Sequence, residues 1–481
     1  MKLSQLIQGL PLENRGAGDP EITGVTCDTR TLRPGGLFAA LPGTREDGAD
    51  YIAAALDRGA AAILCRTPPE TPGPWLATEE PRRAYALLCR AWFGNPAAEL
   101  TLVGVTGTNG KTTTTYLLKT VLEAVLGVKA GLIGTNRNLV GDRALPARRT
   151  TPDPWELYRL LDGMRSAGCS HVVMEVSSHA LALERTAGLT FRAGIFTNLT
   201  RDHLDFHGTM SAYLEAKSRL FRQCGTAVLN LEDPAGRRLA GTVPCRTVTW
   251  SLSRAGDLTG EDLRLFPDRV AFTLRRGGET WPVQVPIPGR FTVCNAMGVL
   301  ACCQALGLPL GEAAAALARA PGVKGRAEVV PVPAPFTVVI DYAHTPDALE
   351  NILLTLRDGT AGRLICLFGC GGDRDRTKRP VMGEIAGDLA DLVILTSDNP
   401  RTEDPEAILD QVTAGFSDRS SPYIRDPDRR AAIQTALSLC RAGDVLLLAG
   451  KGHETTQEIG GKAIHFDERE EIAFFFQKDT L

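Results

Sequence analysis

One stretch of the chain constrains the fold more than any other: an apolar run, a glycine-rich turn and a Lys-Thr pair. Residues 102–105 predict a short buried strand, and apolar residues recur at helical spacing from Leu117 to Val125. Between them the chain reads Gly104-Val105-Thr106-Gly107-Thr108-Asn109-Gly110-Lys111-Thr112-Thr113. This order is typical of a loop whose backbone N–H groups bind phosphate. Lys111 would then reach the β- and γ-phosphates of a nucleotide, and Thr112 would ligate Mg²⁺.

The glycines of this turn depart from the strict phosphate-loop pattern. That pattern, G-x-x-x-x-G-K-[ST], requires glycine at position 105, where the chain has valine, and the glycines stand at 104 and 107 instead. The alternative interpretation is an ordinary glycine turn followed by a solvated lysine. The strand before the turn and the helix after it favour the phosphate-binding interpretation.

Length and composition indicate an ordinary globular protein. The 481 residues suggest three domains of about 150 residues each. Apolar residues make up 43% and charged residues 23% of the chain, which carries a net charge of −3 and no basic block. We therefore expect no nucleic acid and no membrane surface as a partner. The apolar stretch 299–318 contains Gln304, Pro309 and Glu312, which predicts core helix rather than a membrane span.

Cysteine usage and the first residues indicate the compartment. Twelve cysteines are scattered without a CxxC pair or zinc-ligand spacing, which is typical of reduced thiols. No apolar segment of signal-peptide type follows Met1. We expect a cytoplasmic protein.

Two further signals follow the glycine turn. A strand over 170–176 carries Glu175 near its end, where phosphate-loop enzymes place a carboxylate for Mg²⁺; the alternative is a carboxylate that caps the next helix. His203 lies in a cluster of histidines and aspartates, which favours a functional site over an isolated structural histidine. Taken alone, Lys217 reads as a solvated helix lysine, and Asn295 either contacts a nucleotide or caps a helix.

The last third of the chain repeats an apolar strand followed by a polar loop. The four strand–loop pairs are 338–344, 364–374, 392–401 and 445–454, separated by helix-length segments. This repetition predicts βα units and a parallel sheet, whose ligands bind outside the carboxyl ends of the strands. The loops carry two arginines, an aspartate and a glutamate, which suit a zwitterionic ligand. The alternative is that these are polar surface loops of no function.

The expected fold class is α/β with three domains: a small N-terminal α/β domain, a central phosphate-loop ATPase-type domain and a C-terminal Rossmann-like domain with a mainly parallel sheet. Asn95-Pro96 and the stretch from Gly325 mark the predicted boundaries, which gives domains at 1–97, 98–324 and 325–481. In the first domain, the loops at 27–30 and 42–48 have turn composition and by themselves predict turns.

Several of these motifs together resemble the Mur ligases, ATP-dependent amide ligases that build the stem peptide of peptidoglycan. The resemblance rests on motifs in family order across two domains, and Asp28-Thr29-Arg30 extends it to the first domain: Gly107-Thr108-Asn109-Gly110-Lys111-Thr112, Met174-Glu175-Val176-Ser177-Ser178-His179, Asn198-Leu199 with Asp202-His203-Leu204-Asp205, Gly325-Arg326, Asp341-Tyr342-Ala343-His344 and Gly450-Lys451-Gly452-His453-Glu454. In this family the displaced glycine is the normal form of the loop.

The resemblance implies a role for each matched position. The residues expected to bind ATP phosphates are Gly107, Thr108, Asn109, Gly110, Lys111, Thr112 and Thr113, and those expected to contact the rest of ATP are Asn295, Arg326 and His344. Thr112 and Glu175 would ligate one Mg²⁺, while His203 and a carbamylated Lys217 would support a second. Lys111, Lys217 and His203 are the expected catalytic residues.

The resemblance also implies the contacts of the two remaining substrates. The residues expected to hold a UDP-sugar peptide are Thr29, Thr44, Arg45, Glu46, Thr150, Thr151, Ser177 and Arg185. The expected amino-acid pocket consists of Arg374, Asp398, Asn399, Pro400, Arg401, Gly450 and Glu454. Leu183 stands where a glutamine is frequent in the family, two residues before Arg185, so that contact differs here.

The implied reaction adds meso-diaminopimelate to UDP-N-acetylmuramoyl-L-alanyl-D-glutamate through an acyl phosphate, in a monomeric enzyme. Arg401 would meet the far carboxylate of diaminopimelate; otherwise it would pair with Glu403 or Asp404 on the surface. L-lysine is the alternative amino acid. A D-glutamate-adding ligase, a folylpolyglutamate synthetase and a non-enzymatic ATP-binding switch are rival functions. The loop at 398–401 argues against the two ligases, and the switch would need no amino-acid pocket.

Overall fold

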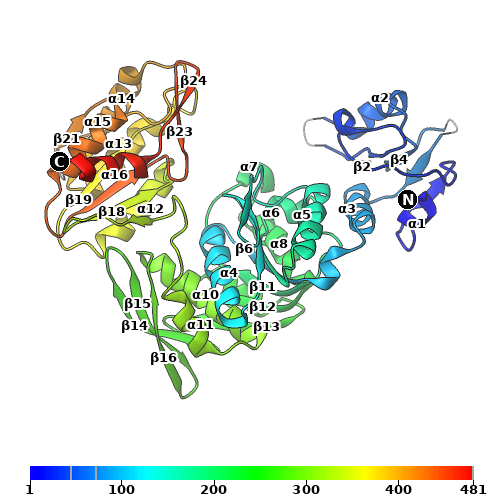
Figure 1. Ribbon diagram of the computed structural model, residues 1–481, viewed down its shortest axis with the longest axis horizontal. Coiled ribbons are helices and arrows are strands. Elements are labelled where there is room, and N and C mark those ends of the chain that lie inside the picture. The colour runs from blue at the N-terminus through cyan, green and yellow to red at the C-terminus, as the bar shows by residue number, and fades with distance from the viewer. Residues whose placement is uncertain (44–45, 71–72, 479–481) are drawn as a thin grey trace. The chain divides into compact units, whose positions relative to one another are not determined.

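The computed structural model describes residues 1–43, 46–70 and 73–478, so the predicted contacts Thr44 and Arg45 lie outside the described residues. The chain divides into two compact units, Met1–Asp257 with Gly298–Ala313, and Leu258–Met297 with Ala314–Leu481. Three large sheets with helices between their strands confirm the predicted α/β class (Figure 1).

The N-terminal sheet has five strands in the order β1-β5-β4-β3-β2. Its strands are β1 (Glu13–Arg15), β2 (Val25–Thr26), β3 (Leu37–Ala39), β4 (Ala62–Cys65) and β5 (Trp75–Ala77). All neighbours are parallel except β1, which pairs antiparallel with β5. Its helical elements are α1 (Leu3–Leu6), η1 (Thr29–Thr31), η2 (Gly48–Tyr51), α2 (Ile52–Asp57), α3 (Pro81–Trp92) and η3 (Pro96–Glu99).

The central strands of the first unit follow the order β13-β12-β11-β6-β10-β7-β8-β9. Their bounds are β6 (Thr101–Thr106), β7 (Ala130–Ile133), β8 (Asn138–Val140), β9 (Arg143–Leu145), β10 (His171–Glu175), β11 (Phe191–Phe196), β12 (Cys224–Asn230) and β13 (Arg246–Ser251). The run from β13 to β7 is parallel. Parallel strands are covered by helices, which is why β6 reads as a continuous apolar run.

The helices of this part connect the parallel strands. They are α4 (Lys111–Leu126), α5 (Pro154–Ser166), α6 (Ser178–Ala182), α7 (Leu204–His207), α8 (Met210–Ser218), η4 (Arg219–Gln223) and α9 (Pro234–Ala240). Helix α4 packs against β6, β7 and β10. Most of the apolar stretch 299–318 falls in α10 (Arg290–Leu306) and α11 (Leu310–Leu317), as the core-helix interpretation predicted, and the residues of these two helices are divided between the two units. Among the described residues, no helix has both the length and the apolar character that a bilayer crossing requires.

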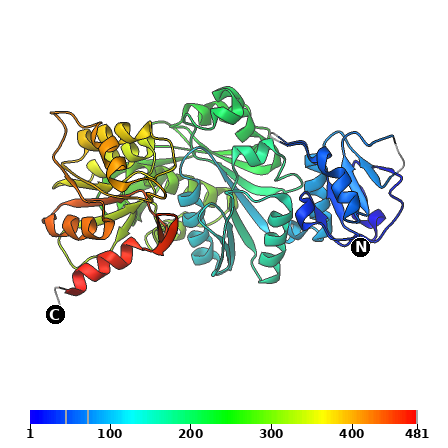
Figure 2. The same cartoon turned by 90° about the horizontal axis from the view of Figure 1, so that it is seen from above.

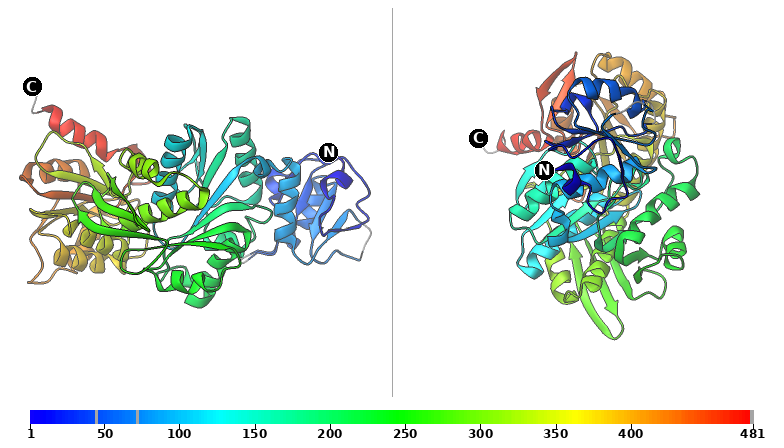
Figure 3. Two further views of the ribbon diagram at one scale, coloured as in Figure 1. Left: turned by 90° about the horizontal axis from the view of Figure 1, so that it is seen from below. Right: turned by 90° about the vertical axis from the view of Figure 1, so that its right-hand side faces the viewer.

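The second unit contains a long antiparallel ribbon, drawn in green in Figure 3, and a mainly parallel sheet. The ribbon is β14 (Leu258–Leu265), β15 (Val270–Arg276) and β16 (Glu279–Val285). The sheet has the order β17-β18-β22-β19-β20-β21, with only β17 antiparallel. Its strands are β17 (Glu328–Val330), β18 (Thr337–Asp341), β19 (Leu364–Phe368), β20 (Leu392–Leu395), β21 (Tyr423–Arg425) and β22 (Val445–Ala449).

Five helices and a small hairpin complete this unit. They are α12 (Pro346–Arg357), α13 (Lys378–Leu389), α14 (Pro405–Thr413), α15 (Arg429–Leu439), the hairpin β23 (Thr456–Ile459) and β24 (Lys462–His465), and α16 (Glu468–Lys478). Helix α16, in red in Figure 2, leads to the C-terminus. The four predicted strand–loop pairs are confirmed as β18, β19, β20 and β22, so all four polar loops begin at the carboxyl edge of one sheet.

The buried centre of this sheet gives a stability prediction. Leu448 in β22 is fully buried, whereas Leu354 in α12 is 47% exposed. Leu448→Ala should lower the free energy of unfolding of this sheet by about 2–5 kcal/mol, because it leaves a cavity. Leu354→Ala, the control, should change it by less than about 0.5 kcal/mol. Native-state hydrogen exchange of β19 and β22 amides measures both; equal protection in the two variants would contradict the assigned core.

Candidate active site

The glycine turn links β6 directly to α4 and has room only for glycine at its first position. Gly107 has φ +150° and Gly110 has φ +82°, both in the left-handed range that disfavours side chains. A Cβ on Gly107 would lie 1.9 Å from Thr197 Oγ1. The turn therefore has the strand–loop–helix geometry of a phosphate-binding loop, with α4 beginning at Lys111.

The segment that follows β11 holds this loop in place. Thr108 N donates to Asn198 O at 2.9 Å, and Asn109 N donates to Asn198 Oδ1 at 2.9 Å. Thr197 Oγ1 in turn donates to Asn109 O at 2.6 Å. In the sequence Asn198 stands out only as part of a family motif, and its supporting role was missed. The polar run after an apolar strand was the available signal.

Two lysine ammonium groups share one backbone carbonyl of the loop. Lys111 Nζ donates to Gly107 O at 3.0 Å and to Thr108 O at 2.7 Å, and Lys217 Nζ donates to Gly107 O at 2.8 Å. Lys217 is only 1% exposed, so its interpretation as a solvated helix lysine is wrong. Burial, reinforced by the nearby charge of Lys111, holds the pKa of Lys217 well below its usual value. Lys217 is thus poised to carry a neutral amine.

Glu175 ends β10, which lies alongside β6. Its side chain is 1% exposed, and its two oxygens accept hydrogen bonds from Thr135 N at 2.9 Å and Thr135 Oγ1 at 3.0 Å. The next helix, α6, is capped by Ser177, whose Oγ accepts from Ala180 N. The alternative in which Glu175 caps that helix is therefore wrong, and its carboxylate lies at the same sheet edge as the glycine turn.

The four predicted peptide-contact residues of the central part are connected through one another and Glu175. The hydroxyl oxygens of Thr135 and Thr150 are hydrogen-bonded at 3.0 Å, and Thr151 Oγ1 donates to Glu175 O at 2.8 Å. Ser177 N donates to Thr151 Oγ1 at 3.0 Å, and Arg185 Nη1 to Thr151 O at 3.0 Å. Thr150, Thr151, Ser177 and Arg185 therefore form one polar group beside the carboxylate. Leu183 is the C-terminal cap residue of α6 in this group.

The histidines of the central part do form a cluster, as predicted. The ring of His179 lies 4.8 Å from that of His203 and 5.4 Å from that of His207. His203 is exposed and lies 3.4 Å from the carboxylate of Asp202. His207 Nε2 makes a 2.9 Å hydrogen bond with Ser178 Oγ, and burial lowers the pKa of His207 to about 4. At neutral pH this ring is uncharged.

The N-terminal loop residues are turn residues in the structure. Thr29 begins η1, and Asp28 caps it by accepting from Arg30 N at 2.9 Å. Glu46 accepts a hydrogen bond from the Tyr51 hydroxyl at 2.7 Å. The turn interpretation is confirmed for the loop at 27–30, and the substrate contacts of Thr29 and Glu46 stay predictions.

In the second unit, three charged or polar side chains from two loops form a closed group. Asn399 Nδ2 donates to Glu454 Oε2 at 2.9 Å. Lys451 Nζ donates to the same Glu454 oxygen at 2.9 Å and to Asn399 Oδ1 at 3.1 Å. Lys451 is fully buried. The sequence places Lys451 within a motif but predicts no role for it, because a lysine beside two glycines carries no signal of burial.

Arg401 points into the same region from the β20 loop. Its Nε lies 3.2 Å from Glu458 Oε2, and its Nη1 donates to Gly372 O at 2.7 Å. The alternative pairing with Glu403 or Asp404 is wrong: Glu403 pairs with Arg376 and Arg379, and Asp404 caps α14. The Arg379 guanidinium lowers the pKa of Glu403 to about 2.

The remaining pocket residues surround this group with varied exposure. Asp398 is 9% exposed, and a Cβ added to Gly450 would lie 2.6 Å from its Oδ2. The Pro400 carbonyl packs so closely on Gly372 that a Cβ there would approach it to 1.9 Å. Arg374 is exposed and donates from Nη1 to Asp373 O at 3.1 Å.

Two of the predicted nucleotide contacts of this unit lie around Tyr342, whose part in the site the sequence patterns did not reveal. The Arg326 guanidinium lies 5.5 Å from the Tyr342 ring, and its Nε is buried without a hydrogen-bond acceptor among the described residues. The His344 ring lies 4.6 Å from the same ring. The third, Asn295, is 4% exposed inside α10, so the helix-cap alternative for it is wrong.

A glycine loop with paired lysines, a neighbouring carboxylate and a Rossmann-like unit with a charged pocket define a nucleotide-dependent α/β enzyme. Comparison with known proteins narrows this class: residues 21–86 match the Mur ligase family catalytic domain, 105–303 the Mur ligase middle domain, and 325–452 the Mur ligase glutamate ligase domain. The chain belongs to the Mur ligase family and is an ATP-dependent ligase that forms amide bonds.

Full-length relatives support this assignment. Two are UDP-N-acetylmuramoyl-L-alanyl-D-glutamate–2,6-diaminopimelate ligases (MurE). The one from Clostridium tetani is 41% identical to this chain, and the match covers 98% of each protein. The one from Gloeobacter violaceus is 44% identical, and the match covers 98% of this chain and 97% of the relative. A solved structure of a ligase of that name covers 96% of both chains at 33% identity, with a TM-score of 0.75. The MurF ligase of Thermotoga maritima, solved with ADP, shares the fold at 20% identity, covering 95% of this chain and 97% of its own, with a TM-score of 0.57. The predicted three-domain α/β fold is confirmed.

The support of the glycine loop by Asn198 gives a binding prediction. Asn198→Ala removes two side-chain hydrogen bonds to Asn109. We expect ATP to bind about five- to tenfold more weakly, the size of one or two such bonds. Calorimetric titration with a non-hydrolysable ATP analogue measures this. Asn351→Ala is the control, because Asn351 is an exposed residue of α12 whose side chain donates to Asp347 O in its own helix. Unchanged affinity in Asn198→Ala would contradict the supporting role.

Proposed function

We propose that this enzyme joins meso-2,6-diaminopimelate to UDP-N-acetylmuramoyl-L-alanyl-D-glutamate in peptidoglycan precursor synthesis, with ATP as the energy source. The observation that carries the amino-acid assignment is the charged pocket of the second unit. Arg401 offers Nη2 with no protein acceptor among the described residues, beside the Asn399–Glu454 pair. Arginine recognises carboxylates bidentately, and of the two candidate amino acids only diaminopimelate carries a carboxylate at its far end. The names of the full-length relatives support the same choice.

The proposed reaction proceeds through an acyl phosphate. The glycine loop binds the triphosphate through its backbone N–H groups, and Lys111 leaves its loop carbonyls to offset charge on the transferring phosphoryl group. The substrate carboxylate attacks the γ-phosphoryl group, and the deprotonated amine then attacks the acyl carbon and releases phosphate. Thr151, Ser177 and Arg185 would hold the peptide beside Glu175. The ADP bound in the Thermotoga maritima MurF structure supports the nucleotide assignment.

Mg²⁺ fits the residues at the edge of the central sheet. Thr112 supplies a hydroxyl and Glu175 a buried carboxylate, the oxygen donors that Mg²⁺ prefers. Among the described residues, no three His, Cys, Asp or Glu side chains form a metal-binding group. Mg²⁺ is usually bound by one or two protein oxygens together with water and substrate phosphates. When bound, the ion would offset phosphate charge. His203, and Lys217 as a carbamate, are the proposed supports of a second ion.

We further propose the domain boundaries 1–97, 98–324 and 325–481 and a cytoplasmic monomer. The three family matches, at residues 21–86, 105–303 and 325–452, each fall within one of these ranges. The twelve cysteines are scattered without a CxxC pair or zinc-ligand spacing, which supports a reducing compartment. Sedimentation of the purified protein tests the monomer.

The amino-acid assignment is tested by ligation assays with each candidate. Purified protein, ATP and the UDP-dipeptide should release phosphate with meso-diaminopimelate and far less with L-lysine. Arg401→Ala should lower kcat/KM for diaminopimelate roughly ten- to hundredfold and change it little for lysine, because a charge-assisted bond is lost. Arg425→Ala is the control, since Arg425 pairs with Glu406 and Asp410 instead. Preference of the wild type for lysine, or an unaffected Arg401→Ala, would refute this assignment.

The carbamate on Lys217 is tested by chemical rescue. The neutral amine that burial favours would attack CO₂, forming a C–N bond and releasing a proton, and the resulting carbamate is an anionic oxygen ligand. Lys217→Ala should lower ligation by roughly a hundredfold, as loss of metal-site partners does. Added formate or acetate should restore part of it. Lys129→Ala, an exposed control, should stay fully active. A Lys217→Ala enzyme that is folded and as active as the control would contradict the carbamate.

A further inference from the structure

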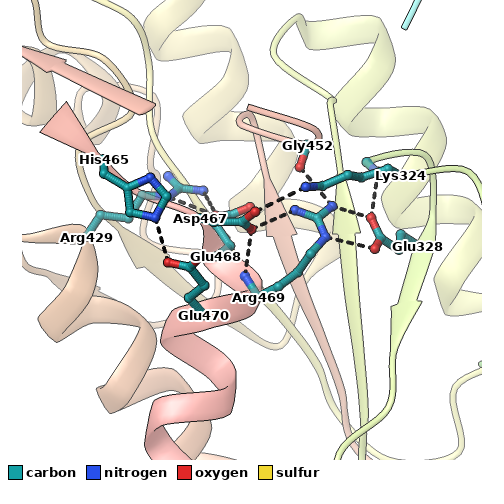
Figure 4. A network of polar contacts seen from close by, with 10 residues as sticks. Lys324, Glu328, Arg429, Gly452, His465, Asp467, Glu468, Arg469 and Glu470 are labelled. Carbon is teal, nitrogen blue, oxygen red and sulfur yellow. Dashed lines mark hydrogen bonds and ion pairs between the residues drawn. The ribbon is translucent and has the colours of Figure 1, made fainter. Parts of the chain in front are cut away.

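The start of the C-terminal helix gathers charged side chains from several distant parts of the second unit (Figure 4). Asp467 precedes α16, and Glu468 and Arg469 are its first two residues. None of the three belongs to the predicted active-site residues. Each of the three nevertheless contacts a segment that contains predicted active-site residues, either directly or through one intermediate side chain. The start of α16 is therefore connected to the proposed active site.

The Arg469 guanidinium donates to four oxygens of three residues at once. Its Nε donates to Glu328 Oε1 at 2.8 Å, and its Nη2 donates to the second oxygen of that carboxylate. Nη2 also donates to Gly452 O at 3.1 Å, while Nη1 donates to Asp467 Oδ1 at 3.0 Å. The side chains of Arg469 and Glu328 are each 19% exposed. A planar guanidinium has five donors in a fixed fork and can serve four such acceptors, whereas a lysine ammonium has only three donors.

The contact with Glu328 reaches the segment that carries Arg326. Gly325 N donates to Glu328 Oε2 at 2.6 Å. Lys324 Nζ lies 3.1 Å from Asp467 Oδ2. The start of α16 therefore contacts Lys324, before Gly325, and Glu328, after it. Gly325 itself packs on the β22 loop so closely that an added Cβ would lie 2.3 Å from His453 N. Small movements of either segment are therefore transmitted to the other.

The contact with Gly452 reaches the amino-acid pocket. Gly452 lies between Gly450 and Glu454, both proposed pocket residues. The neighbouring Glu468 contacts the same edge of the sheet through Arg429. Glu468 pairs with Arg429, which donates to Ser397 O at 3.2 Å and to Ala449 O at 2.9 Å. Both side chains of that pair are buried, at 0% and 1% exposure. Through this pair, the start of α16 stabilises the chain at the ends of β20 and β22, where the two pocket loops begin.

We propose that Arg469 is a positioning residue for ligation, which couples the pocket loop 450–454 to the Arg326 segment 324–328. The proposal rests on the proposed function, because Arg326 and the pocket loop are assigned to ATP and the amino acid there. Arg469 is not among the residues assigned to contacts with either substrate. Its guanidinium sets the distance between the two segments, so its loss affects the binding of both ATP and the amino acid.

The kinetic test compares Arg469→Met with a matched control, Arg430→Met. Arg430 also pairs α15 with α16, through Glu471, and it donates as well to His465 O, which lies outside both segments. In Arg469→Met, KM should rise about tenfold for ATP and for diaminopimelate, since tenfold corresponds to about 1.4 kcal/mol, one charge-assisted hydrogen bond. KM for the UDP-dipeptide should not change. A rise in all three KM values, or equal effects in Arg430→Met, would show that Arg469 only helps α16 to pack against the rest of the unit, and would overturn the proposal.

A double variant distinguishes two effects of Arg469→Met: the loss of the bond to Gly452 and the unpaired Glu328 carboxylate. In Glu328→Gln/Arg469→Met no charge is stranded, but the bond to Gly452 is still missing. Both KM values should therefore stay raised. Recovery to wild-type values would show that the stranded Glu328 caused the effect and would overturn the coupling. Arg469→Lys should fall between wild type and Arg469→Met, since lysine keeps the charge but loses the fork.

Hydrogen exchange tests the coupling without any assumption about the reaction. Peptides covering 324–328 and 450–455 should both lose protection in Arg469→Met and keep it in Arg430→Met. Unchanged protection in Arg469→Met would overturn the proposal even in an enzyme that ligates diaminopimelate. Conversely, a wild-type protein inactive with diaminopimelate would refute the proposed function, while the exchange result would still decide the coupling.

Discussion

Parallel pairing of β6 with β10 and β11 is the constraint on which the central site depends. Because the carboxyl ends of parallel strands meet at one edge, the glycine loop, Glu175 and Asn198 arrive side by side from positions far apart in the chain. The same rule operates in the second unit, where β18, β22, β19 and β20 present four polar loops at one edge. At each edge, hydrogen bonds between neighbouring loops then fix the side chains of the proposed site.

Buried charge sets the character of both sites. Lys217 is held against the Gly107 carbonyl in a space that disfavours its ammonium form, which makes its amine chemically available. Lys451 instead lies in hydrogen-bond contact with Glu454 and Asn399. Buried charges are costly unless paired, and breaking such pairs is strongly destabilising. Arg429 and Arg379 are likewise paired, with Glu468 and Glu403, and each donates to a loop carbonyl, of Ser397 and Gly371 respectively.

Local sequence patterns predict the elements well and the environments of single side chains poorly. The strand at 102–105, the helix after Lys111 and the four strand–loop pairs are all confirmed, because periodicity and glycine turns are local signals. The same patterns suggest a solvated Lys217 and leave open a helix cap at Glu175 and a surface pairing of Arg401 with Glu403, and all three are wrong. Each error concerns a partner distant in sequence or the burial that distant segments provide, which periodicity cannot reveal.

The sequence alone determined the fold class, the family and the order of the motifs, since these follow from strand and turn patterns and from short runs of particular residues. The tertiary structure decided which side chains share a site. It placed Lys217 and Lys111 on one carbonyl, made Tyr342 the centre of the Arg326 and His344 contacts, and joined Arg469 to both Glu328 and Gly452. The physical reason is that burial and hydrogen-bond geometry depend on which strands become neighbours, and that is a property of the whole packed chain.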